Sequence, residues 1–422
     1  MKICIIGLGY VGLPLLINLS KHFQVLGYDL DKKKIANLKK FILQKDLNIN
    51  KKKLKKKNVE FSYDRQAISK CNIIIVAVPT PVKNQKPDLS LLKKACIDIG
   101  KNLKKNSIII FESTVYPGVS EKICAPLIQK CSGLKYKKNF NIAYSPERIN
   151  PGDKNYTLEK LQKVISADSS MTLKKVKYIY SKIVKKIYLA ESIQVAEAAK
   201  AIENAQRDIN IAFMNEIANI FDKMNINTQQ VLRAARSKWN FVNFRPGLVG
   251  GHCIGVDPYY LAHIAKKNNY NPKIILAGRD INEKMPNYVF SKISKNFHGK
   301  LSKLDILITG ITFKENCSDI RNSKIIDLYK LLVDKCKSVT VYDPIAKPFE
   351  EELLNNYSIK LKNIINYKKK FDVCVLAVNH NFFKKKINLI LKKTKEKSVF
   401  FDVMSGYRES KIKKYNKKYL SL

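Results

Sequence analysis

Short apolar runs alternate with amphipathic stretches from residue 1 to about residue 185. The runs at 2–6, 24–28, 72–78 and 107–112 have the length of buried strands, and the stretches between them have the spacing of helices that bury one face. Parallel strands joined by covering helices produce this rhythm. The pattern therefore predicts a parallel, doubly wound sheet.

The pattern changes in the middle of the chain. Residues 192–224 have a helical spacing of apolar positions that no proline or glycine interrupts. A helix of that length would extend about 50 Å, which is enough to link two domains. A glycine-rich loop follows at 245–258. Strand-like runs then return at 304–310, 338–342, 371–378 and 398–403, so we expect an α/β protein with two doubly wound domains joined by a long central helix.

The composition is typical of a folded protein with more than one domain. The chain has 422 residues, of which 45% are hydrophobic. No apolar run reaches the roughly 18 residues of a membrane span, and the N-terminus enters a strand without a signal-peptide cleavage site. We expect a cytoplasmic protein without membrane insertion.

The formal charge of +44 comes mostly from lysines spread along the whole chain. The densest run, at 51–57, contains one leucine and no aromatic residue, which is typical of a solvated helix face or loop. Nucleic-acid-binding surfaces usually combine basic and aromatic residues on one face, so the charge alone does not indicate such a partner. A basic surface would still attract a substrate that carries a diphosphate.

A glycine loop directly follows the first predicted strand. Its GxGxxG spacing permits a tight turn, lets a pyrophosphate approach the backbone and opens a helix whose amides favour phosphate. Such a turn can be purely steric, but Asp29 ends the second strand where an acid would bind ribose hydroxyls and repel a 2′-phosphate. Together they predict NAD as the cofactor. The candidate contacts are Gly7, Gly9, Tyr10, Val11, Gly12 and Asp29.

The nine cysteines are scattered, without a CxxC pair or a cluster at metal-ligand spacing. We expect neither a disulfide framework nor a metal site, and most of these cysteines to be inert core residues. Cys253 differs, because it lies between glycines in the loop 250–258, four residues before Asp257. Glycines let a ligand come close, and a thiolate is a strong nucleophile. Cys253 is therefore either catalytic or structural.

Two polar residues of the long helix favour the catalytic interpretation. Lys200 and Asn204 are four residues apart and share one helix face, from which they could stabilise an oxyanion and orient a water molecule. Most lysines of this chain are expected to be solvated. Lys200, however, lies in the lysine-poor, alanine-rich segment 195–207, which suggests close packing.

Seven motifs in the same order and register resemble those of the UDP-glucose/UDP-N-acetylmannosamine dehydrogenase family, over essentially the whole chain. They are 7–12 with Asp29, Val-Pro-Thr-Pro at 78–81, Glu-Ser-Thr-Val at 112–115, Ser-Pro-Glu-Arg at 145–148, Ala199-Lys200 to Asn204, the loop 250–257, and 313–316 with 319–323. The stretch 238–249 resembles the branch that acts on UDP-N-acetylhexosamines and supplies hexosaminuronic acids for capsules and O-antigens.

This resemblance implies a three-part architecture and an oligomer. A Rossmann NAD-binding domain would occupy 1–188, a central helical dimerisation segment with the cysteine loop 189–298, and a Rossmann-like UDP-binding domain 299–422. The protein would be a homodimer or a higher homo-oligomer.

The resemblance also implies a four-electron oxidation of a primary alcohol to a carboxylate. Cys253 would attack the aldehyde to give a thiohemiacetal, and a second hydride transfer would leave a thioester for water to hydrolyse. Lys200 would stabilise the oxyanion with help from Asn204, Asp257 would position Lys200 or the water, and Glu147 would be the general base. Thr114 would contact the water or the nicotinamide.

The remaining roles implied by the family are contacts with ligands. The cofactor contacts would include Thr80, Thr114 and Arg321. The substrate contacts would be Glu147, Arg148, Lys200, Asn204, Arg245, Gly250, Phe313 and Lys314, with Arg245 reaching a neighbouring subunit.

One departure bears on the substrate. Members of the family that act on UDP-glucose carry a second glutamate four residues after the first, where this chain has Pro151. This favours UDP-GlcNAc or UDP-GalNAc as the substrate, with UDP-ManNAc or UDP-glucose as alternatives. Two other classes stay open: a 6-phosphogluconate or hydroxyacid dehydrogenase that transfers one hydride, and a basic nucleic-acid-binding protein on a Rossmann scaffold.

Overall fold

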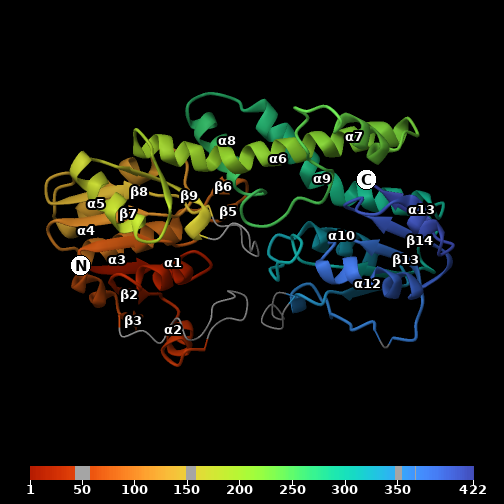
Figure 1. Cartoon of the computed structure of the whole chain (residues 1–422), viewed down its shortest axis with the longest axis horizontal. Coiled ribbons are helices and arrows are strands. Elements are labelled where there is room, and N and C mark those ends of the chain that lie inside the picture. The colour runs from red at the N-terminus through yellow and green to blue at the C-terminus, as the bar shows by residue number, and fades with distance from the viewer. Residues whose placement is uncertain (43–57, 149–157, 347–353, 366) are drawn as a thin grey trace. The chain divides into compact units, whose positions relative to one another are not determined.

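The computed structural model describes residues 1–42, 58–148, 158–346, 354–365 and 367–422. These residues form two compact units (Figure 1). The first contains Met1–Glu203 and Tyr259–Tyr270, and the second contains Asn204–Pro258 and Asn271–Leu422. The long helix α6 (Ile193–Lys223) begins in the first unit and ends in the second.

The first unit is built on a sheet that has eight strands among the described residues. Their order is β10-β9-β8-β7-β4-β1-β2-β3, and all neighbours are parallel except β8 and β9. The six neighbouring strands β8-β7-β4-β1-β2-β3 follow the order of a Rossmann sheet. The strands are β1 Lys2–Ile6, β2 Gln24–Tyr28, β3 Val59–Ser62, β4 Ile73–Val76, β7 Ser107–Phe111, β8 Phe140–Tyr144, β9 Gln162–Ala167 and β10 Lys186–Leu189.

Helices connect and cover these strands. The central strands β1, β4 and β7 are apolar along almost their whole length, because both faces of the sheet are buried. The helices are α1 Gly12–Leu19, α2 Lys32–Lys39, α3 Ser90–Asn102, α4 Ala125–Ser132, α5 Ser170–Ser181 and the shorter η3 Arg65–Lys70, η4 Ser120–Cys124 and η5 Leu158–Lys160. A small hairpin pairs β5 (Val82–Lys83) with β6 (Lys86–Pro87).

The second unit has a parallel sheet of five strands within its described part, in the order β12-β11-β13-β14-β15. Alternate residues of β11 enter separate apolar cores on the two faces: Ile306 and Ile308 pack in one, and Leu307 packs in the other. The strands are β11 Asp305–Thr309, β12 Ser338–Tyr342, β13 Phe371–Leu376, β14 Thr394–Asp402 and β15 Lys418–Ser421. The helices are α7 Thr228–Ala235, α8 Asp257–Lys267 (which continues into the first unit), α9 Lys273–Lys295, α10 Lys324–Val333, α12 Asn381–Lys392 and α13 Glu409–Lys413.

The first turn after the leading strand is constructed in the same way in both units. Gly7 after β1 has φ +91° and donates to Tyr28 O at 2.9 Å; Gly310 after β11 has φ +85° and donates to Tyr342 O at 2.9 Å. The next amide in each turn donates to the aspartate after the second strand, with Leu8 N 2.9 Å from Asp29 Oδ2. Ile311 N lies 2.7 Å from Asp343 Oδ2 in the second unit. The two sheets therefore begin with the same glycine–aspartate arrangement.

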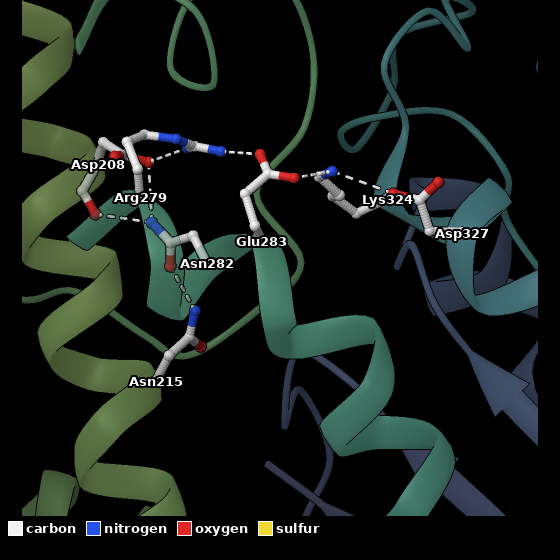
Figure 2. A network of polar contacts seen from close by, with 7 residues as sticks. All are labelled: Asp208, Asn215, Arg279, Asn282, Glu283, Lys324 and Asp327. Carbon is white, nitrogen blue, oxygen red and sulfur yellow. Dashed lines mark hydrogen bonds and ion pairs between the residues drawn. The ribbon is translucent and has the colours of Figure 1, made fainter. Parts of the chain in front are cut away.

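A buried polar network connects three helices of the second unit (Figure 2). Asp208 on α6 pairs with Arg279 on α9 at 2.6 Å, and both side chains are almost fully buried. Figure 2 shows Glu283 between Arg279 and Lys324, so that the network reaches the first residue of α10. Lys324 also pairs with Asp327 at 3.0 Å. This chain of contacts fixes α6, α9 and α10 to one another.

The predicted fold class is confirmed: the chain is α/β with two doubly wound units. The strands expected at 2–6, 24–28 and 338–342 have those bounds, and the helix expected at 192–224 is Ile193–Lys223. The run expected as a strand at 72–78 is shorter, because the chain turns after Val76 to form the loop that carries Thr80. The lysine run 51–57 and Pro151 lie outside the described residues.

Candidate functional site

The loop between β1 and α1 has the geometry of a phosphate-binding turn. A Cβ atom on Gly12 would lie 1.8 Å from Gly7 O, so the helix can pack on the turn only with glycine there. A Cβ atom on Gly9 would meet nothing within 4 Å, which leaves the backbone open to a ligand. Val11, the N-cap of α1, makes no side-chain capping hydrogen bond. An anion can therefore approach the first-turn amides, with Tyr10 lying beside them.

Asp29 lies at the end of β2 next to this turn. Its carboxylate accepts hydrogen bonds from Leu8 N at 2.9 Å and Asp31 N at 3.0 Å, and its side chain is 11% exposed. The Lys34 ammonium lies 2.8 Å from Asp29 Oδ2. Sequence reasoning identified the aspartate and missed this ion pair, whose i,i+5 spacing across a helix start gives no recognisable motif.

Two loops meet where the strands β4 and β7 end. Thr80 Oγ1 donates to Thr114 O at 2.7 Å, and Ser113 Oγ donates to Val78 O at 2.7 Å. The Tyr260 hydroxyl on α8 donates to Thr80 O. The structure thus brings together the two predicted cofactor contacts Thr80 and Thr114, at the edge of the sheet where α/β proteins bind ligands.

Glu147 follows β8 and lies beside a buried lysine. Glu147 Oε1 accepts from Arg148 N at 2.6 Å, and its Oε2 lies 3.8 Å from Lys163 Nζ on β9. Arg148 forms an ion pair with Glu203 at 2.5 Å. Lys163 was missed by sequence reasoning, although a lysine inside the apolar run of β9 is a signal that could have drawn attention to it.

Lys200 is 8% exposed on α6, as its alanine-rich surroundings suggested. One turn earlier, Glu197 accepts hydrogen bonds from Gly118 N at 2.5 Å and Ser120 N at 3.0 Å. Burial raises the pKa of Glu197 to about 7, against the opposing effect of these amides. Glu197 therefore ties the loop that contains Thr114 to the helix that carries Lys200.

In the second unit, Cys253 is the exposed member of the nine cysteines, all of which are free thiols in described parts of the chain. Its carbonyl accepts from Val256 N at 3.1 Å and Asp257 N at 2.8 Å, in the turn that leads into α8. Asp257 is 3% exposed, and its Oδ2 accepts from Asn204 Nδ2 at 2.5 Å. Asn204 and Asp257, two of the predicted site residues, are therefore brought together on the same unit as the thiol.

The thiol loop is docked on the segment 313–322. Gly251 N donates to Asn322 O at 3.2 Å, and a Cβ atom on Gly251 would lie 2.6 Å from the Phe313 ring. On Gly250 a Cβ atom would lie 2.5 Å from Asn322 O. Both glycines are therefore required by close packing. Phe313 and Gly250, which were predicted to contact substrate, both belong to the packing between this loop and the segment 313–322.

His252, which precedes the thiol, joins the same segment. Its Nε2 lies 3.0 Å from Asp319 Oδ2, and Arg321 Nη2 lies 2.6 Å from the same carboxylate. Burial alone would raise the pKa of Asp319, but the hydrogen bonds from His252 and Arg321 hold it well below its usual range. Arg321 is half exposed, at 49% of its side chain, and keeps its guanidinium beside the thiol loop.

The loop before the thiol carries the exposed Arg245. Asn215 on α6 holds this loop from both sides of Gly247: its Oδ1 accepts from Gly247 N at 2.8 Å, and its Nδ2 donates to Gly247 O at 3.1 Å. Burial and the positive charges of Arg245 and Arg233 lower the pKa of Arg236. Lys314 Nζ lies 5.6 Å from the centre of the Phe313 ring. The neighbouring charges of Arg233, Arg236 and Arg245 suit an anionic ligand.

The predicted site residues thus form two groups, one on each compact unit. The first unit contains the glycine loop with Asp29, and Thr80, Thr114, Glu147, Arg148 and Lys200. The second unit contains Asn204, Arg245, Gly250, Cys253, Asp257, Phe313, Lys314 and Arg321.

A Rossmann sheet with an open glycine turn and an acid at the end of β2 defines the chain as an NAD-dependent dehydrogenase. It belongs to the UDP-glucose/GDP-mannose dehydrogenase family: the NAD-binding domain of that family matches residues 1–184, its central domain 194–284 and its UDP-binding domain 307–409. The chain is therefore an oxidoreductase of nucleotide sugars, as the sequence motifs indicated.

Relatives match over nearly the whole chain. A UDP-N-acetyl-D-glucosamine 6-dehydrogenase from Pseudomonas aeruginosa is 45% identical over 390 residues, covering 91% of this chain and 92% of the relative. Protein CapL from Staphylococcus aureus is 42% identical over 413 residues and covers 95% of each chain. The solved structure of a UDP-D-ManNAc dehydrogenase from Pyrococcus horikoshii aligns with a TM-score of 0.85 at 27% identity, over 97% of this chain and 96% of the other.

None of the described helices is long and apolar enough to cross a bilayer.

Proposed function

We propose that the chain oxidises the C6 alcohol of a UDP-N-acetylhexosamine, UDP-GlcNAc or UDP-GalNAc, to the uronate, for the synthesis of surface polysaccharide. The observation that carries this proposal is the exposure of Cys253, on a loop packed against the segment 313–322 of the matched UDP-binding domain. The similarity to a relative named UDP-N-acetyl-D-glucosamine 6-dehydrogenase supports the choice of sugar.

The reaction removes four electrons from the sugar in two oxidations. NAD would be held at the glycine turn, to which the open backbone at Gly9 and the amides of α1 are suited, and two NAD molecules in succession would each take up one hydride. The Cys253 thiolate adds to the aldehyde carbon and forms a C–S bond. The second hydride loss converts this adduct to a thioester. Water then cleaves the C–S bond and releases the carboxylate and the thiol.

Five side chains assist these steps in the proposed mechanism. Lys200 and Asn204, four residues apart on α6, donate to the oxygen that becomes negative when sulfur or water attacks. Asp257, which accepts a hydrogen bond from Asn204, positions Lys200 or the attacking water. Glu147 accepts a proton from the water during hydrolysis. Thr114 contacts the water or the nicotinamide.

The remaining candidates bind the two ligands. Thr80 and Arg321 are proposed to contact the cofactor. Arg148, Arg245, Gly250, Phe313 and Lys314 are proposed to contact the substrate, together with Glu147, Lys200 and Asn204. Support for an anionic ligand comes from the charges of Arg245, Arg233 and Arg236, which gather near the loop held by Asn215. We also propose the domain boundaries 1–188, 189–298 and 299–422.

We further propose a homodimer in the cytoplasm. Large apolar side chains recur on one face of α6 at a helical repeat: Val195, Ile202, Phe213 and Ile220 are 47%, 55%, 53% and 44% exposed. Such a stripe on a helix suits burial against a second copy of the chain. The cytoplasm is the setting in which NAD and a reactive thiol are both maintained.

The test is an assay of the purified protein with NAD and each of UDP-GlcNAc, UDP-GalNAc, UDP-ManNAc and UDP-glucose. We expect two NADH for each sugar consumed, with an acetamido sugar at C2 preferred. Equal or better use of UDP-glucose would refute the assignment of an N-acetylhexosamine, and preferred use of UDP-ManNAc would replace GlcNAc and GalNAc.

A second arm of the assay tests the thiol. Cys253→Ala should lose uronate formation, while Cys336→Ala, a matched change at a half-buried thiol, should keep it. One NADH for each sugar together with a fully active Cys253→Ala enzyme would contradict the four-electron mechanism. Tight, salt-sensitive binding of DNA or RNA without activity on any UDP-sugar would support the alternative of a nucleic-acid-binding protein.

A further inference from the structure

A cluster of four titratable side chains lies behind the loop that carries Glu147, entirely within the first unit. Lys163 on β9, Glu112 after β7 and Tyr180 on α5 are buried, with exposed fractions of 2%, 2% and 0%. The Glu147 side chain is 10% exposed and completes the cluster. Only Glu147 has a place in the proposed mechanism, so the other three groups need an explanation.

Lys163 is the centre of this cluster. Its Nζ lies 3.0 Å from Glu112 Oε1 and 3.8 Å from Glu147 Oε2. The same atom donates to Pro146 O at 3.1 Å and to Ser145 O at 3.4 Å. A lysine ammonium has three protons to donate. One buried cation therefore fixes the backbone before Glu147 and is shared by two carboxylates.

The two carboxylates have unequal surroundings. Tyr180 OH and Lys163 Nζ both contact Oε1 of Glu112, and Glu112 Oε2 is buried without a hydrogen-bond partner among the described residues. Burial raises the pKa of Glu112, and the charge of Glu147 acts in the same direction while Lys163 opposes it. Two ionised carboxylates beside one ammonium would leave a net negative charge in a buried place, which is costly.

We propose that Lys163 is the positioning residue of Glu147, and that Glu112 and Glu147 compete for the positive charge of Lys163. The three side chains together then set the protonation state in which Glu147 works. Lys163 favours the ionised Glu147 that can accept a proton from water. Glu112 opposes it whenever Glu112 is itself ionised. This inference rests on the proposed role of Glu147 as general base.

Other charged groups around Glu147 enter the same balance. Besides Lys163 on β9, Glu112 after β7 and Tyr180 on α5, the structure places the next residue, Arg148, beside it. Arg148 donates its backbone N–H to Glu147 and forms an ion pair with Glu203 on α6. Arg148 with Glu203 is close to neutral as a pair. The buried Lys163 and Glu112 therefore remain the dominant opposing charges.

The test compares the acidic limb of the pH profile of kcat in four proteins, because that limb reports protonation of the essential base. Lys163→Met should move the limb to higher pH, and Glu112→Gln should move it to lower pH, each by about one unit. The double variant should return toward the wild-type limb, since the opposing charges are removed together. The KM for the UDP-sugar should change less than twofold in each case.

A purely structural role predicts a different outcome. Loss of packing would lower kcat at every pH without moving the limb, or would move both single variants in the same direction; either result would overturn the inference. Lys163→Arg keeps the charge and should retain the wild-type limb. If circular dichroism and NAD titration show that Lys163→Met does not fold, Lys163→Arg and Glu112→Gln still provide the comparison.

A second measurement is independent of turnover. Infrared titration of the protonated carboxyl band in the substrate-free wild type, Glu112→Gln, Lys163→Arg and Glu147→Gln should show two coupled carboxyl protonations in the wild type. Removal of either glutamate should leave one protonation with a changed midpoint. Uncoupled carboxyls would contradict the inference even in an active enzyme. Coupled carboxyls in a protein that oxidises no UDP-sugar would instead refute the proposed function alone.

Discussion

At the scale of single residues, Glu197 shows how burial turns a carboxyl into a source of pH-dependent stability. It holds the Gly118–Ser120 turn by two amide hydrogen bonds, and burial raises its pKa from 4.5 to about 7. The folded protein then binds this proton between about pH 4.5 and 7, where the unfolded chain releases it. The stability that Glu197 contributes is therefore complete below its unfolded pKa and is lost as the pH rises through 7.

We expect this loss to be visible in a comparison with Glu197→Gln, which cannot titrate. The free energy of unfolding of the wild type relative to the variant should fall by about 2–3 kcal/mol between pH 4.5 and pH 8, measured by urea denaturation. A difference that stays constant over this range, or rises with pH, would show that the carboxylate is ionised throughout in the folded protein.

Gly310 is a second residue whose contribution can be isolated. It has φ +85°, and a Cβ atom there would lie 2.6 Å from Val378 Cβ. Gly299, also in the second unit, has φ +77° with nothing within 4 Å of its Cβ position. Gly299→Ala should therefore cost only the left-handed backbone strain of about 1 kcal/mol, whereas Gly310→Ala should cost more than about 2 kcal/mol. Equal losses in thermal unfolding would contradict the packing argument.

At the scale of elements, the network in Figure 2 joins α6, α9 and α10 within the unit that holds the thiol loop. Arg279 on α9 pairs with the buried Asp208, and its guanidinium nitrogens lie 3.9 Å from the Cβ position of Gly255 in that loop. Asn282 donates to Asp208 Oδ1 at 2.8 Å, and its Oδ1 accepts from Asn215 Nδ2 at 2.8 Å. Side chains from two helices thus lie against this part of the chain: Asn215 of α6 holds Gly247 before Cys253, and Arg279 of α9 lies beside Gly255 after it.

Loss of the ion pair between Arg279 and Asp208 should lower the free energy of unfolding strongly. Arg279→Met removes the cation that faces the buried Asp208 and should lower the free energy of unfolding by about 3–5 kcal/mol. Lys284→Met breaks an ion pair of the same helix, Lys284 with Asp280, in which both side chains are largely exposed, and should cost less than about 1 kcal/mol. Similar losses for the two variants in urea denaturation would mean that burial does not govern the strength of these pairs.

Elements could be predicted from the sequence more completely than the site. The strands β1 and β2 and the helix α6 were found almost to the residue, because a run buried on both faces and a stretch without proline or glycine leave a local signal. The glycine turn, Asp29 and Cys253 were also visible. Lys163 and Arg279 were not, since each acts through partners about 50 to 70 positions away. The lysine inside the apolar run of β9 was a local signal for Lys163, but a linear pattern does not identify the partners of either residue.

At the scale of the whole molecule, the apolar stripe on α6 should decide the oligomeric state. Phe213, in the middle of this stripe, is 53% exposed, and Phe213→Glu would place a charge in the proposed interface between two copies. We expect this variant to be largely monomeric in analytical ultracentrifugation at micromolar concentration, while the wild type is a dimer or larger. Gln194→Glu adds the same charge on α6 about a quarter turn from the stripe and should leave the assembly intact. A dimeric Phe213→Glu protein would place the interface elsewhere.

The matching turns of the two units have a consequence for how nucleotide preference could be altered. Asp343 occupies the place of Asp29, yet it is 6% exposed and accepts from four amides and from His380 Nε2 at 3.2 Å. The two turns thus differ in one respect: the Asp29 side chain is 11% exposed, whereas the Asp343 side chain is fully buried and bonded within its own unit. Replacement of Asp29, which follows β2, should therefore change which dinucleotide is accepted. The same replacement of Asp343, which follows β12, should instead destabilise the second unit, and other side chains would still recognise the sugar nucleotide.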